Sequence, residues 1–340
     1  MSIRIEVLGS PGEDNATLVE IDSGSSLDRV LFDCGGGVLD GRSVSEIQSI
    51  GHLCLSHFHM DHICGFDTFF RHNYNRDTGP VHVWGPAGST AVMAHRFGGF
   101  VWNLHHHQAG EWRIHEVADN RAKTTGFVTS EAFANEHSLG ETPAGWDESG
   151  RFELKTIELH HGSIPSIGYR IEEPDRLNID PEQLAEFGQP PGRWLADVKN
   201  SELADESTTE LPDGSSSTLG DLRADLMRTS SGASMAYLTD FYAETGSGEW
   251  EDLVAWLSQV DTLVCECQYR HSDEALAQKN SHMTTTKVAQ LASDAGVNEL
   301  ILQHVSRRYE TADWREMLSE AQQIFPESKF PVGWSTALSS

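Results

Sequence analysis

Positive charge is scarce in this sequence. Its 340 residues include 24 Lys and Arg against 52 Asp and Glu, which gives a formal net charge of −28. Such a surface repels polyanions at long range and favours solubility, but it does not specify a fold. The charge therefore weighs against a nucleic-acid partner, with the reservation that a few arginines gathered in a cleft can still bind phosphate inside an acidic envelope.

Long apolar runs and paired cysteines are also missing. No stretch reaches the roughly 18 apolar residues that a membrane-spanning helix needs. The first residues, MSIRIEVLGSPGEDN, predict a short strand and a turn rather than a signal peptide. The five cysteines are few and odd in number, which argues against a disulfide framework. We therefore expect a cytoplasmic protein with no membrane partner.

Short strand-like runs alternate with helical segments along most of the chain. IRIEVLG, DRVLFDCGGG and GHLCLS have the apolar character of strands, and a similar order returns in the second half. In TTTKVAQLASDAG, apolar residues keep helical spacing up to Gly296, a residue type that commonly caps a helix. Strands interleaved with helices predict an α/β protein in which helices cover the outer faces of sheets.

The stretch CLSHFHMDHICGF places four ligand-type side chains just after a predicted buried strand: His57, His59, Asp61 and His62. Zinc binds imidazole nitrogen and carboxylate oxygen, and a catalytic zinc keeps one position open for water. The spacing allows His57 and His59 to face one metal, and Asp61 and His62 to face a second. Two metals about 4 Å apart can share a hydroxide and clamp a substrate oxygen.

Three more candidate ligands follow predicted strands further along the chain. His161, Asp240 and His304 each come after an apolar β-type run, so each can lie at the same sheet edge as the first cluster. Their presence disfavours the alternative interpretation, a surface histidine cluster with an adventitious metal. His160 competes with His161, because only one of two consecutive strand residues can face the metals.

This ordered set of motifs resembles the metallo-β-lactamase superfamily. The resemblance implies a four-layer αββα sandwich with two Zn²⁺ per subunit, for which Mn²⁺, Fe²⁺ or Co²⁺ can substitute. It also implies the ligand sets, which are His57, His59 and His161 for one metal, Asp61, His62 and His304 for the other, and Asp240 as the bridge. The family spacing favours His161 over His160. Asp33, in LFDCGGG, matches a residue that orients a ligand and does not bind the metal.

A further pair of residues narrows the resemblance. Glu266 in DTLVCECQY and His282 in SHMTTTKVAQ are similar to the proton-donating pair of the ribonuclease Z branch. Cleavage of a phosphodiester needs a proton for the departing ribose oxygen, and a carboxylate beside His282 favours the charged imidazole. Two alternatives stay open: Glu266 can be a strand residue that faces water, and His282 a helix-start residue that bonds only backbone.

The resemblance extends over nearly the whole chain. Residues 172–234, rich in Pro, Gly, Ser, Asp and Glu, predict a protruding arm similar to the one with which ribonuclease Z grips transfer RNA. Arg193 and Lys199 in this arm, together with Arg308, are candidate substrate contacts. Acidic residues surround the arm cations, so phosphate would be gripped less well. Residues 124–150 are an insertion in the single domain 1–340, either a lid on the metal cleft or a disordered surface loop.

The resemblance implies a zinc-dependent endoribonuclease that processes the 3′ end of precursor transfer RNA, as a homodimer. Its catalytic residues would be Asp61, His282 and Glu266. The alternative keeps the fold and the metals but changes the substrate to a small aryl sulfate, phosphodiester, ester, lactone or β-lactam, which the acidic surface and the possible lid favour. A non-catalytic module with a structural zinc is disfavoured, because such a site closes its coordination shell.

Overall fold

The structure is a computed structural model that describes residues 3–23, 26–146 and 151–334. The chain forms two compact units. Unit 1 comprises residues 1–172 and 234–340, and unit 2 comprises residues 173–233. Within the described ranges, no helix combines the length and the apolar character needed to cross a membrane.

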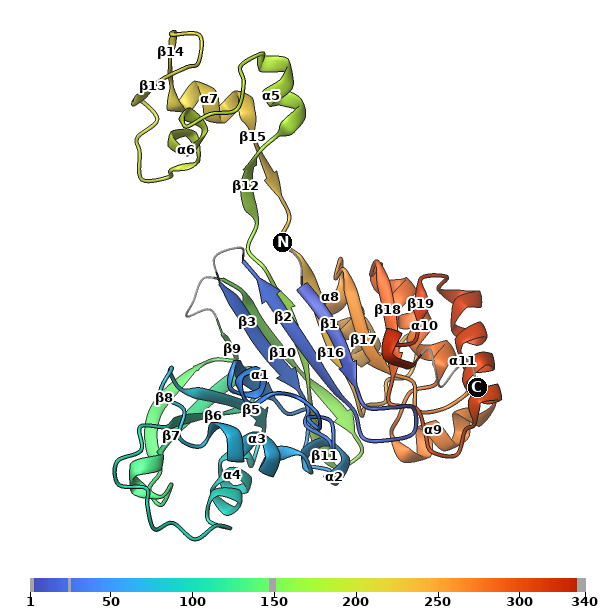
Figure 1. Ribbon diagram of the computed structural model, residues 1–340. Coiled ribbons are helices and arrows are strands. Elements are labelled where there is room, and N and C mark those ends of the chain that lie inside the picture. Colours follow the sequence, from blue (N-terminus) through green and yellow to red (C-terminus); the bar gives the residue numbers. More distant parts are fainter. Residues whose placement is uncertain (1–2, 24–25, 147–150, 335–340) are drawn as a thin grey trace. The chain divides into compact units, whose positions relative to one another are not determined.

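The first sheet of unit 1 follows the chain order from edge to edge (Figure 1). Its central strands, from β3 to β6, are parallel, and antiparallel strands flank them on both sides. In the described residues the strands are β1 (Ile3–Leu8), β2 (Ala16–Asp22), β3 (Leu27–Phe32), β4 (Ile50–Cys54), β5 (Val81–Pro86), β6 (Glu111–Ala118), β7 (Arg121–Val128) and β8 (His137–Pro143).

The second sheet contains the later strands of unit 1 in a different spatial order. Strands β16 to β19 are parallel, whereas β9, β10 and β11 pair antiparallel, and β11 pairs antiparallel with β16. From edge to edge the described strands are β19 (Ser328–Lys329), β18 (Glu299–Gln303), β17 (Thr262–Glu266), β16 (Ser234–Leu238), β11 (Ile164–Glu172), β10 (Glu153–His161) and β9 (Gly145–Trp146).

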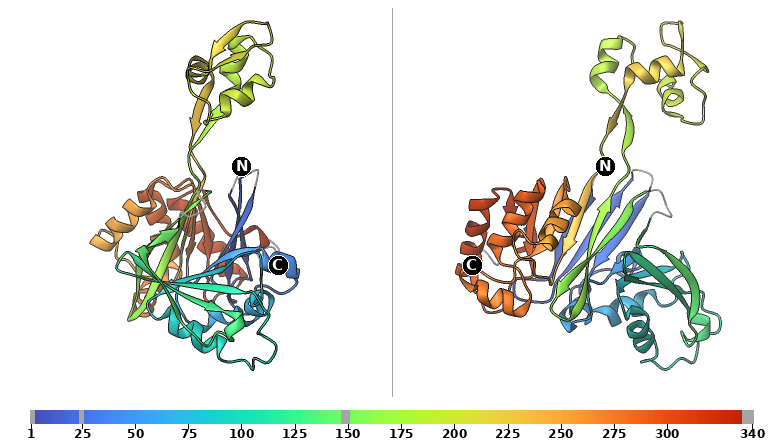
Figure 2. Two further views of the ribbon diagram at one scale, coloured as in Figure 1. Left: turned by 90° about the vertical axis from the view of Figure 1, so that its left-hand side faces the viewer. Right: turned by 180° about the vertical axis from the view of Figure 1, so that it is seen from behind.

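Helices lie on the outer faces of the two sheets, as Figure 1 and Figure 2 show for unit 1. The first sheet carries α1 (Val44–Gln48), α2 (Met60–Ile63), α3 (Phe66–Asn73), α4 (Ser89–Phe97) and the 3₁₀ turn η1 (Thr129–Glu131) in its connections. The second carries α8 (Gly248–Leu257), η2 (His271–Asp273), α9 (Glu274–Asn280), α10 (Thr285–Ala295), α11 (Thr311–Ile324) and η3 (Val332–Trp334).

Two apolar layers hold unit 1 together. Between the sheets, Phe32 of the first sheet stacks on Tyr237 of the second at 5.1 Å between ring centroids, and both rings are buried. On the outer face of the first sheet, Phe66, Phe97 and Trp112 pack in a second buried cluster. Because each sheet buries one face on the other sheet and one on helices, the predicted αββα arrangement is confirmed.

The helix predicted in TTTKVAQLASDAG is α10, which confirms that prediction. The side chain of Thr284 accepts a hydrogen bond from the backbone N–H of Lys287, so Thr284 caps the N-terminus. Gly296 ends the helix with φ +66°, a left-handed conformation that glycine adopts without a Cβ clash. Its buried face includes Val288 and Leu291, which pack on the second sheet.

Unit 2 folds around its own small core. The chain leaves β11 after Glu172 and enters β16 at Ser234, two residues that are paired in register. The elements between them are β12 (Arg176–Ile179), α5 (Pro181–Phe187), α6 (Trp194–Lys199), β13 (Thr208–Glu210), β14 (Ser216–Thr218), α7 (Leu219–Leu226) and β15 (Met227–Ser230). The core side chains are Trp194, Val198, Leu211, Leu219, Leu222 and Leu226.

The predicted insertion at 124–150 lies largely in strands. Its residues belong to β7, η1, β8 and β9, with β8 paired antiparallel to β7 at the edge of the first sheet. Residues 147–150 lie outside the described residues. A role for this segment as a lid stays a prediction, as does the single-domain organisation.

Candidate metal centre

The candidate ligands lie where strands of both sheets end. His57 follows β4 of the first sheet, whereas His161, Asp240 and His304 end or follow β10, β16 and β18 of the second. These three strands run in the same direction. Their carboxyl ends therefore share one edge of the sheet, which is where layered α/β folds commonly place their ligands.

Three residues at strand ends have an unusual backbone. Asp33 after β3, Asp240 after β16 and His304 after β18 have φ values of 57°, 50° and 52°. Residues other than glycine rarely adopt positive φ, and such conformations cluster at functional sites. This conformation ends the extended backbone of each strand, so each side chain lies close to a strand end.

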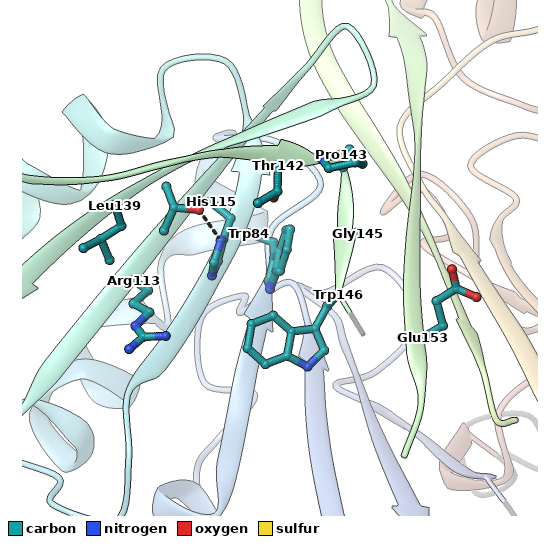
Figure 3. Close-up of a pocket in the computed structure, with 11 residues that line it drawn as sticks. Trp84, Arg113, His115, Leu139, Thr142, Pro143, Gly145, Trp146 and Glu153 are labelled. Carbon is teal, nitrogen blue, oxygen red and sulfur yellow. Dashed lines mark hydrogen bonds between the residues drawn. The ribbon is translucent and has the colours of Figure 1, made fainter. Parts of the chain in front are cut away.

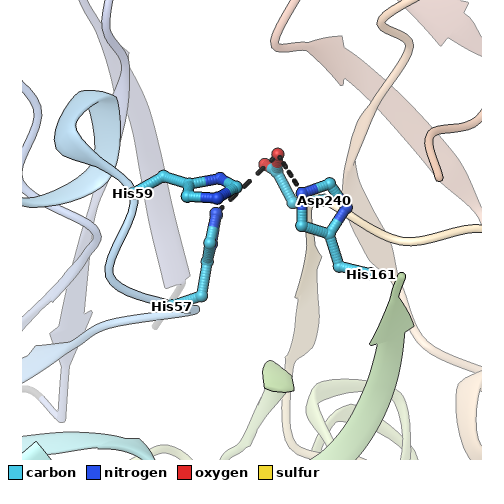
Figure 4. Close-up of side chains that lie close together, drawn as sticks. All are labelled: His57, His59, His161 and Asp240. Atoms are coloured by element: carbon cyan, nitrogen blue, oxygen red, sulfur yellow. Dashed lines mark ion pairs between the residues drawn. The ribbon is translucent and has the colours of Figure 1, made fainter. Parts of the chain in front are cut away.

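The first group of candidate ligands comprises His57, His59, His161 and Asp240 (Figure 4). One nitrogen or oxygen atom of each lies within 4.8 Å of the others. Oδ1 of Asp240 is 4.0 Å from Nε2 of His57 and 3.8 Å from Nε2 of His161. His57, His161 and Asp240 are buried and His59 is half-buried, so the group is accessible from one side.

The second group comprises Asp61, His62 and His304, which satisfy the same distance limit. Oδ2 of Asp240 lies 3.1 Å from Nε2 of His62 and 3.6 Å from Nε2 of His304. Oδ2 of Asp61 is 3.6 Å from each of the same two nitrogens. Asp240 thus turns one oxygen toward each group, and the structure brings all seven predicted ligands together.

The outer nitrogens of the buried imidazoles already have partners. Nδ1 of His57 lies 3.0 Å from Oγ of Ser56, Nδ1 of His62 lies 2.7 Å from Oδ2 of Asp33, and Nδ1 of His161 lies 2.9 Å from a backbone carbonyl. Each ring therefore turns Nε2 inward, as metal-bound histidines do. Within the described residues, Nε2 of His57 is buried without a hydrogen-bond partner. Inward lone pairs beside carboxylates fit a divalent cation such as zinc.

Asp33 is the centre of a buried hydrogen-bond network. Its carboxylate accepts hydrogen bonds from the backbone N–H and the hydroxyl of Ser56, at 2.7 and 2.8 Å, and from the hydroxyl of Tyr237 at 2.7 Å. It also contacts His62 Nδ1. Tyr237 comes from the second sheet, so Asp33 ties both sheets to one candidate ligand, a geometry that suits an orienting role.

The electrostatics of the site favour a bound cation. Burial lowers the pKa of His57 to about 3, which leaves its ring neutral and able to ligate. Burial opposes charge on His62 as well, but the adjacent carboxylates of Asp240 and Asp33 raise the pKa of His62 well above its usual value. Burial also acts to raise the pKa of Asp61, but the opposing effect of His304 and His62 is larger, so the pKa of Asp61 lies below its usual value. The carboxylates thus create a negative field at the centre of the cluster.

The structure places His161, and not His160, in the cluster. The side chain of His161 is 7% exposed, and its ring is 5.3 Å from that of His57. The side chain of His160 is 69% exposed, and its Nδ1 lies 3.6 Å from the carboxylate of Glu249. Alternation along β10 directs the two neighbours to opposite sides.

These neighbours provide a matched pair of variants. We expect His161→Ala to weaken metal binding by at least about tenfold, since even the loss of a group that supports a metal ligand costs that much. His160→Ala should bind metal as the unaltered protein does. Titration of chelator-stripped protein with Zn²⁺ measures both. Equal affinities in the two variants would contradict the assignment of His161.

Glu266 and His282 form a buried pair beside the cluster. Nδ1 of His282 is 2.9 Å from Oε2 of Glu266, and Oε1 of Glu266 accepts a hydrogen bond from the backbone N–H of Phe241 at 2.8 Å. Burial opposes charge on His282, but Glu266 outweighs this effect and raises the pKa of His282 to about 9. Glu266 is fully buried, so the alternative in which it faces water is wrong. The proton-donating role of the pair stays a prediction.

A cleft of about 520 Å³ opens onto the second group. Asp61 and His304 line it together with Gln268, Met60 and Arg307. Gln268, Met60 and Arg307 were not identified as site residues from the sequence. The motif SRRY contains both Arg307 and Arg308, and nothing in the sequence shows which of the two lines the cleft.

None of the three predicted substrate contacts is among the described residues that line this cleft. Arg308 is exposed, with its guanidinium carbon 5.4 Å from the ring centroid of Tyr269, and it is not among the residues that line the cleft. Arg193 and Lys199 are exposed residues of unit 2. Contact of these three cations with substrate stays a prediction.

A second cavity, of about 550 Å³, lies between the sheets at the side of β8 and β9 (Figure 3). Trp84, His115 and Trp146 line it, and within the described residues it includes no predicted site residue. Beside it, His52 and His82 form a buried aromatic stack with His115, with Nδ1 of His82 2.9 Å from Nε2 of His115. Each of these histidines lies in a strand-like motif, GHLC, VHVW or IHEV. The alternation of side chains along these strands could have predicted that the three histidines share the inner face of the sheet.

Comparison with known proteins agrees with this geometry. A family model described as the beta-lactamase superfamily domain matches residues 28–177. Ribonuclease Z of Deinococcus radiodurans is 43% identical over 334 residues, covering 96% of this chain and 97% of the relative. Ribonuclease Z of Gloeothece citriformis is 30% identical over 312 residues, covering 88% of this chain and 83% of the relative.

Solved structures share the fold at low sequence identity. The metallo-beta-lactamase fold protein YhfI of Bacillus subtilis has a TM-score of 0.55 at 14% identity, and human tRNase Z, short form, has a TM-score of 0.51 at 16% identity. Each comparison covers 97% of this chain and 96% of the other.

The two-sheet fold and the histidine and aspartate cluster define a metal-dependent hydrolase of the β-lactamase superfamily. Within this class, the chain belongs to the ribonuclease Z family. The predicted fold and family are thereby confirmed. The number and identity of the metals, the homodimer and the cytoplasmic location stay predictions.

Proposed function

We propose that this chain is an endoribonuclease of the ribonuclease Z type, which cuts precursor transfer RNA on the 3′ side with the help of two divalent cations, zinc foremost. The Glu266–His282 pair beside the cluster supports this proposal most directly. A ribose oxygen is a poor leaving group unless it receives a proton, and the pair puts a donor next to the cluster. Curated relatives named ribonuclease Z align with nearly the full chain.

The cluster would form a dinuclear centre. His57, His59 and His161 would hold one cation, Asp61, His62 and His304 would hold the other, and Asp240 would contact both. Bound divalent cations activate water near neutral pH and stabilise negative charge on phosphoryl oxygens.

The protein side chains then handle protons and orientation. Asp61, half-buried at the mouth of the cleft, accepts a proton from the attacking water. His282 protonates the departing oxygen, while Glu266 holds the ring through its Nδ1. Asp33 fixes the ring of His62.

The distribution of ion pairs supports contact with RNA despite the acidic surface. In unit 2, carboxylates pair with Arg176, Arg223 and Arg228. Among the described residues, Arg193 and Lys199 have no such partner, and they lie at the two ends of α6. An uncommitted cation can replace the counterions of a phosphate without breaking an internal pair.

The homodimer and the location complete the proposal. In a homodimer, unit 2 of one copy can present its cations to RNA that is bound in the cleft of the other. Precursor transfer RNA in the cytoplasm is the expected substrate pool. One chain has a mass of 37.6 kDa, and light scattering of the purified protein should show twice this mass if the protein is a homodimer.

The proposed RNA contact predicts a specific salt response. The double variant Arg193→Ala and Lys199→Ala should bind precursor transfer RNA more weakly and lower the slope of log affinity against log salt by about 2, roughly one for each lost phosphate contact. Hydrolysis of bis(p-nitrophenyl) phosphate should not change. Arg228→Ala is the control, since Arg228 is 72% exposed in the same unit but lies 3.5 Å from Asp180.

Cleavage assays on different substrates separate the candidate functions. Unaltered protein should cleave precursor transfer RNA, with affinity that falls steeply as salt rises. Cleavage of nitrocefin or an aryl sulfate, with none of precursor transfer RNA at any salt concentration, would overturn the proposed function in favour of a small-substrate hydrolase.

A further inference from the structure

The two ring nitrogens of His282 have different surroundings. Nδ1 is committed to Glu266, which is itself fixed by the backbone N–H of Phe241. Nε2 is turned to the side chain of Gln268, with 3.3 Å between the two Nε2 atoms. The nitrogen that would deliver a proton therefore already has a protein partner.

Gln268 is well placed to act on this nitrogen. It lies two residues after Glu266 in the sequence, is half-buried, and lines the 520 Å³ cleft together with Asp61 and His304. Its backbone carbonyl accepts a hydrogen bond from the N–H of Ser306 at 3.2 Å, which connects it to the loop that carries His304. The amide of Gln268 thus belongs both to the His282 site and to the wall of the cleft.

An amide suits this position because it can both donate and accept. When His282 carries a proton on both nitrogens, Nε2 needs an acceptor, and the Oε1 atom of Gln268 can serve. When Nε2 has lost its proton, it needs a donor, and the NH₂ group of Gln268 can serve. A half-turn of the terminal amide, whose torsion is broad and roughly two-fold, exchanges the two.

We propose that Gln268 is a positioning residue for proton transfer, which holds Nε2 of His282 at the cleft before and after it gives up its proton. This role rests on the proposed function. In the reaction, a water oxygen bonds to phosphorus and its proton passes to Asp61. The bond from phosphorus to the ribose oxygen breaks with its electron pair on that oxygen. The Nε2 proton of His282 passes to the ribose oxygen, and the lone pair left on Nε2 accepts a hydrogen bond from Gln268.

The role predicts a defect that depends on the leaving group. Gln268→Met keeps the length of the side chain but cannot hydrogen-bond, so single-turnover cleavage of precursor transfer RNA should slow about tenfold, the effect of one lost hydrogen bond in the transition state. In the same RNA with sulfur in place of the departing ribose oxygen, the leaving group departs as a thiolate, which needs no proton. On this substrate Gln268→Met should match the unaltered protein.

A control variant and the metal content exclude general damage. Gln278→Met changes an exposed glutamine of α9 and should behave as the unaltered protein on both substrates. Elemental analysis should find the same metal content in all three proteins. Equal slowing of Gln268→Met on both substrates, or no slowing on either, would overturn the positioning role while the proposed function stands. No cleavage of the RNA by the unaltered protein would overturn the proposed function and this role together.

Discussion

Asp240→Asn is expected to lower turnover by at least about 10³-fold, because metal ions contribute several kcal/mol of charge stabilisation in the transition state. The variant should also retain fewer than two metal ions per chain. Asp240 is buried and directs one oxygen to each ligand group, with His62 and His304 within 3.6 Å of the second oxygen. Asparagine has the same shape, but it lacks the negative charge and replaces one ligating oxygen with an NH₂ group.

The control for this variant is Asp261→Asn. Like Asp240, Asp261 accepts a hydrogen bond from a hydroxyl, here that of Ser234 at 3.0 Å, and it does not belong to the cluster. It should keep its full metal content and turnover. Elemental analysis and turnover of precursor transfer RNA measure both variants. Normal metal content and turnover in Asp240→Asn would show that Asp240 does not bridge the two groups.

His282→Ala should lose about 10³-fold in kcat on precursor transfer RNA, in the range that general acid catalysis contributes. His282 also forms a third group of ligand-type residues with Asp240 and His304, and its Nδ1 is 3.7 Å from Oδ1 of Asp240. Because the proposed centre assigns the metals to the other seven side chains, the metal content of His282→Ala should not change. The KM for RNA should stay close to that of the unaltered protein, since the proton is transferred only in the transition state.

His106→Ala serves as the comparison, since it removes an exposed histidine from the loop between α4 and β6. It should leave kcat, KM and metal content unchanged. If His282→Ala turned over RNA at the normal rate, the proton-donating role would fail. If it instead lost metal, His282 would belong to the metal centre and not to the leaving group.

The candidate ligands could be found from the sequence because they depend on local features. Each lies shortly after a strand-like run, where ligands of layered α/β folds commonly lie. Their division between two metals came from the resemblance to the metallo-β-lactamase superfamily and stays a prediction. Alternation shows that His160 and His161 differ but not which side of β10 faces the cluster; the family spacing favoured His161, and the structure places His161 there.

Long-range side-chain contacts could not be predicted in the same way. Tyr237 donates to Asp33 from a strand 204 positions away in the sequence. Nothing in the residues that flank Tyr237 marks this contact. The partner of His282 Nε2, Gln268, was hidden for the same reason, since it depends on how the loop after β17 meets the start of α10.

The composition of residues 172–234 set this segment apart from the rest of the chain, but it did not predict the secondary structure and core inside the segment. The Pro, Gly and acidic residues of residues 172–234 conceal short amphipathic pieces, such as α7, whose Leu219, Leu222 and Leu226 are buried in the core of unit 2. In the segment 124–150, β8 has every residue exposed. A strand exposed on both faces lacks the apolar alternation by which strands are recognised, so a loop or lid was expected there.

The proposed mechanism requires that seven side chains bind two metal ions. Mass spectrometric elemental analysis of the protein, purified without chelators and verified as folded, measures the metal content per chain. We expect two transition-metal ions per chain, with zinc the most abundant, and a return to two ions when chelator-stripped protein is reloaded. One ion or none per chain after reloading of folded protein would rule out the dinuclear centre.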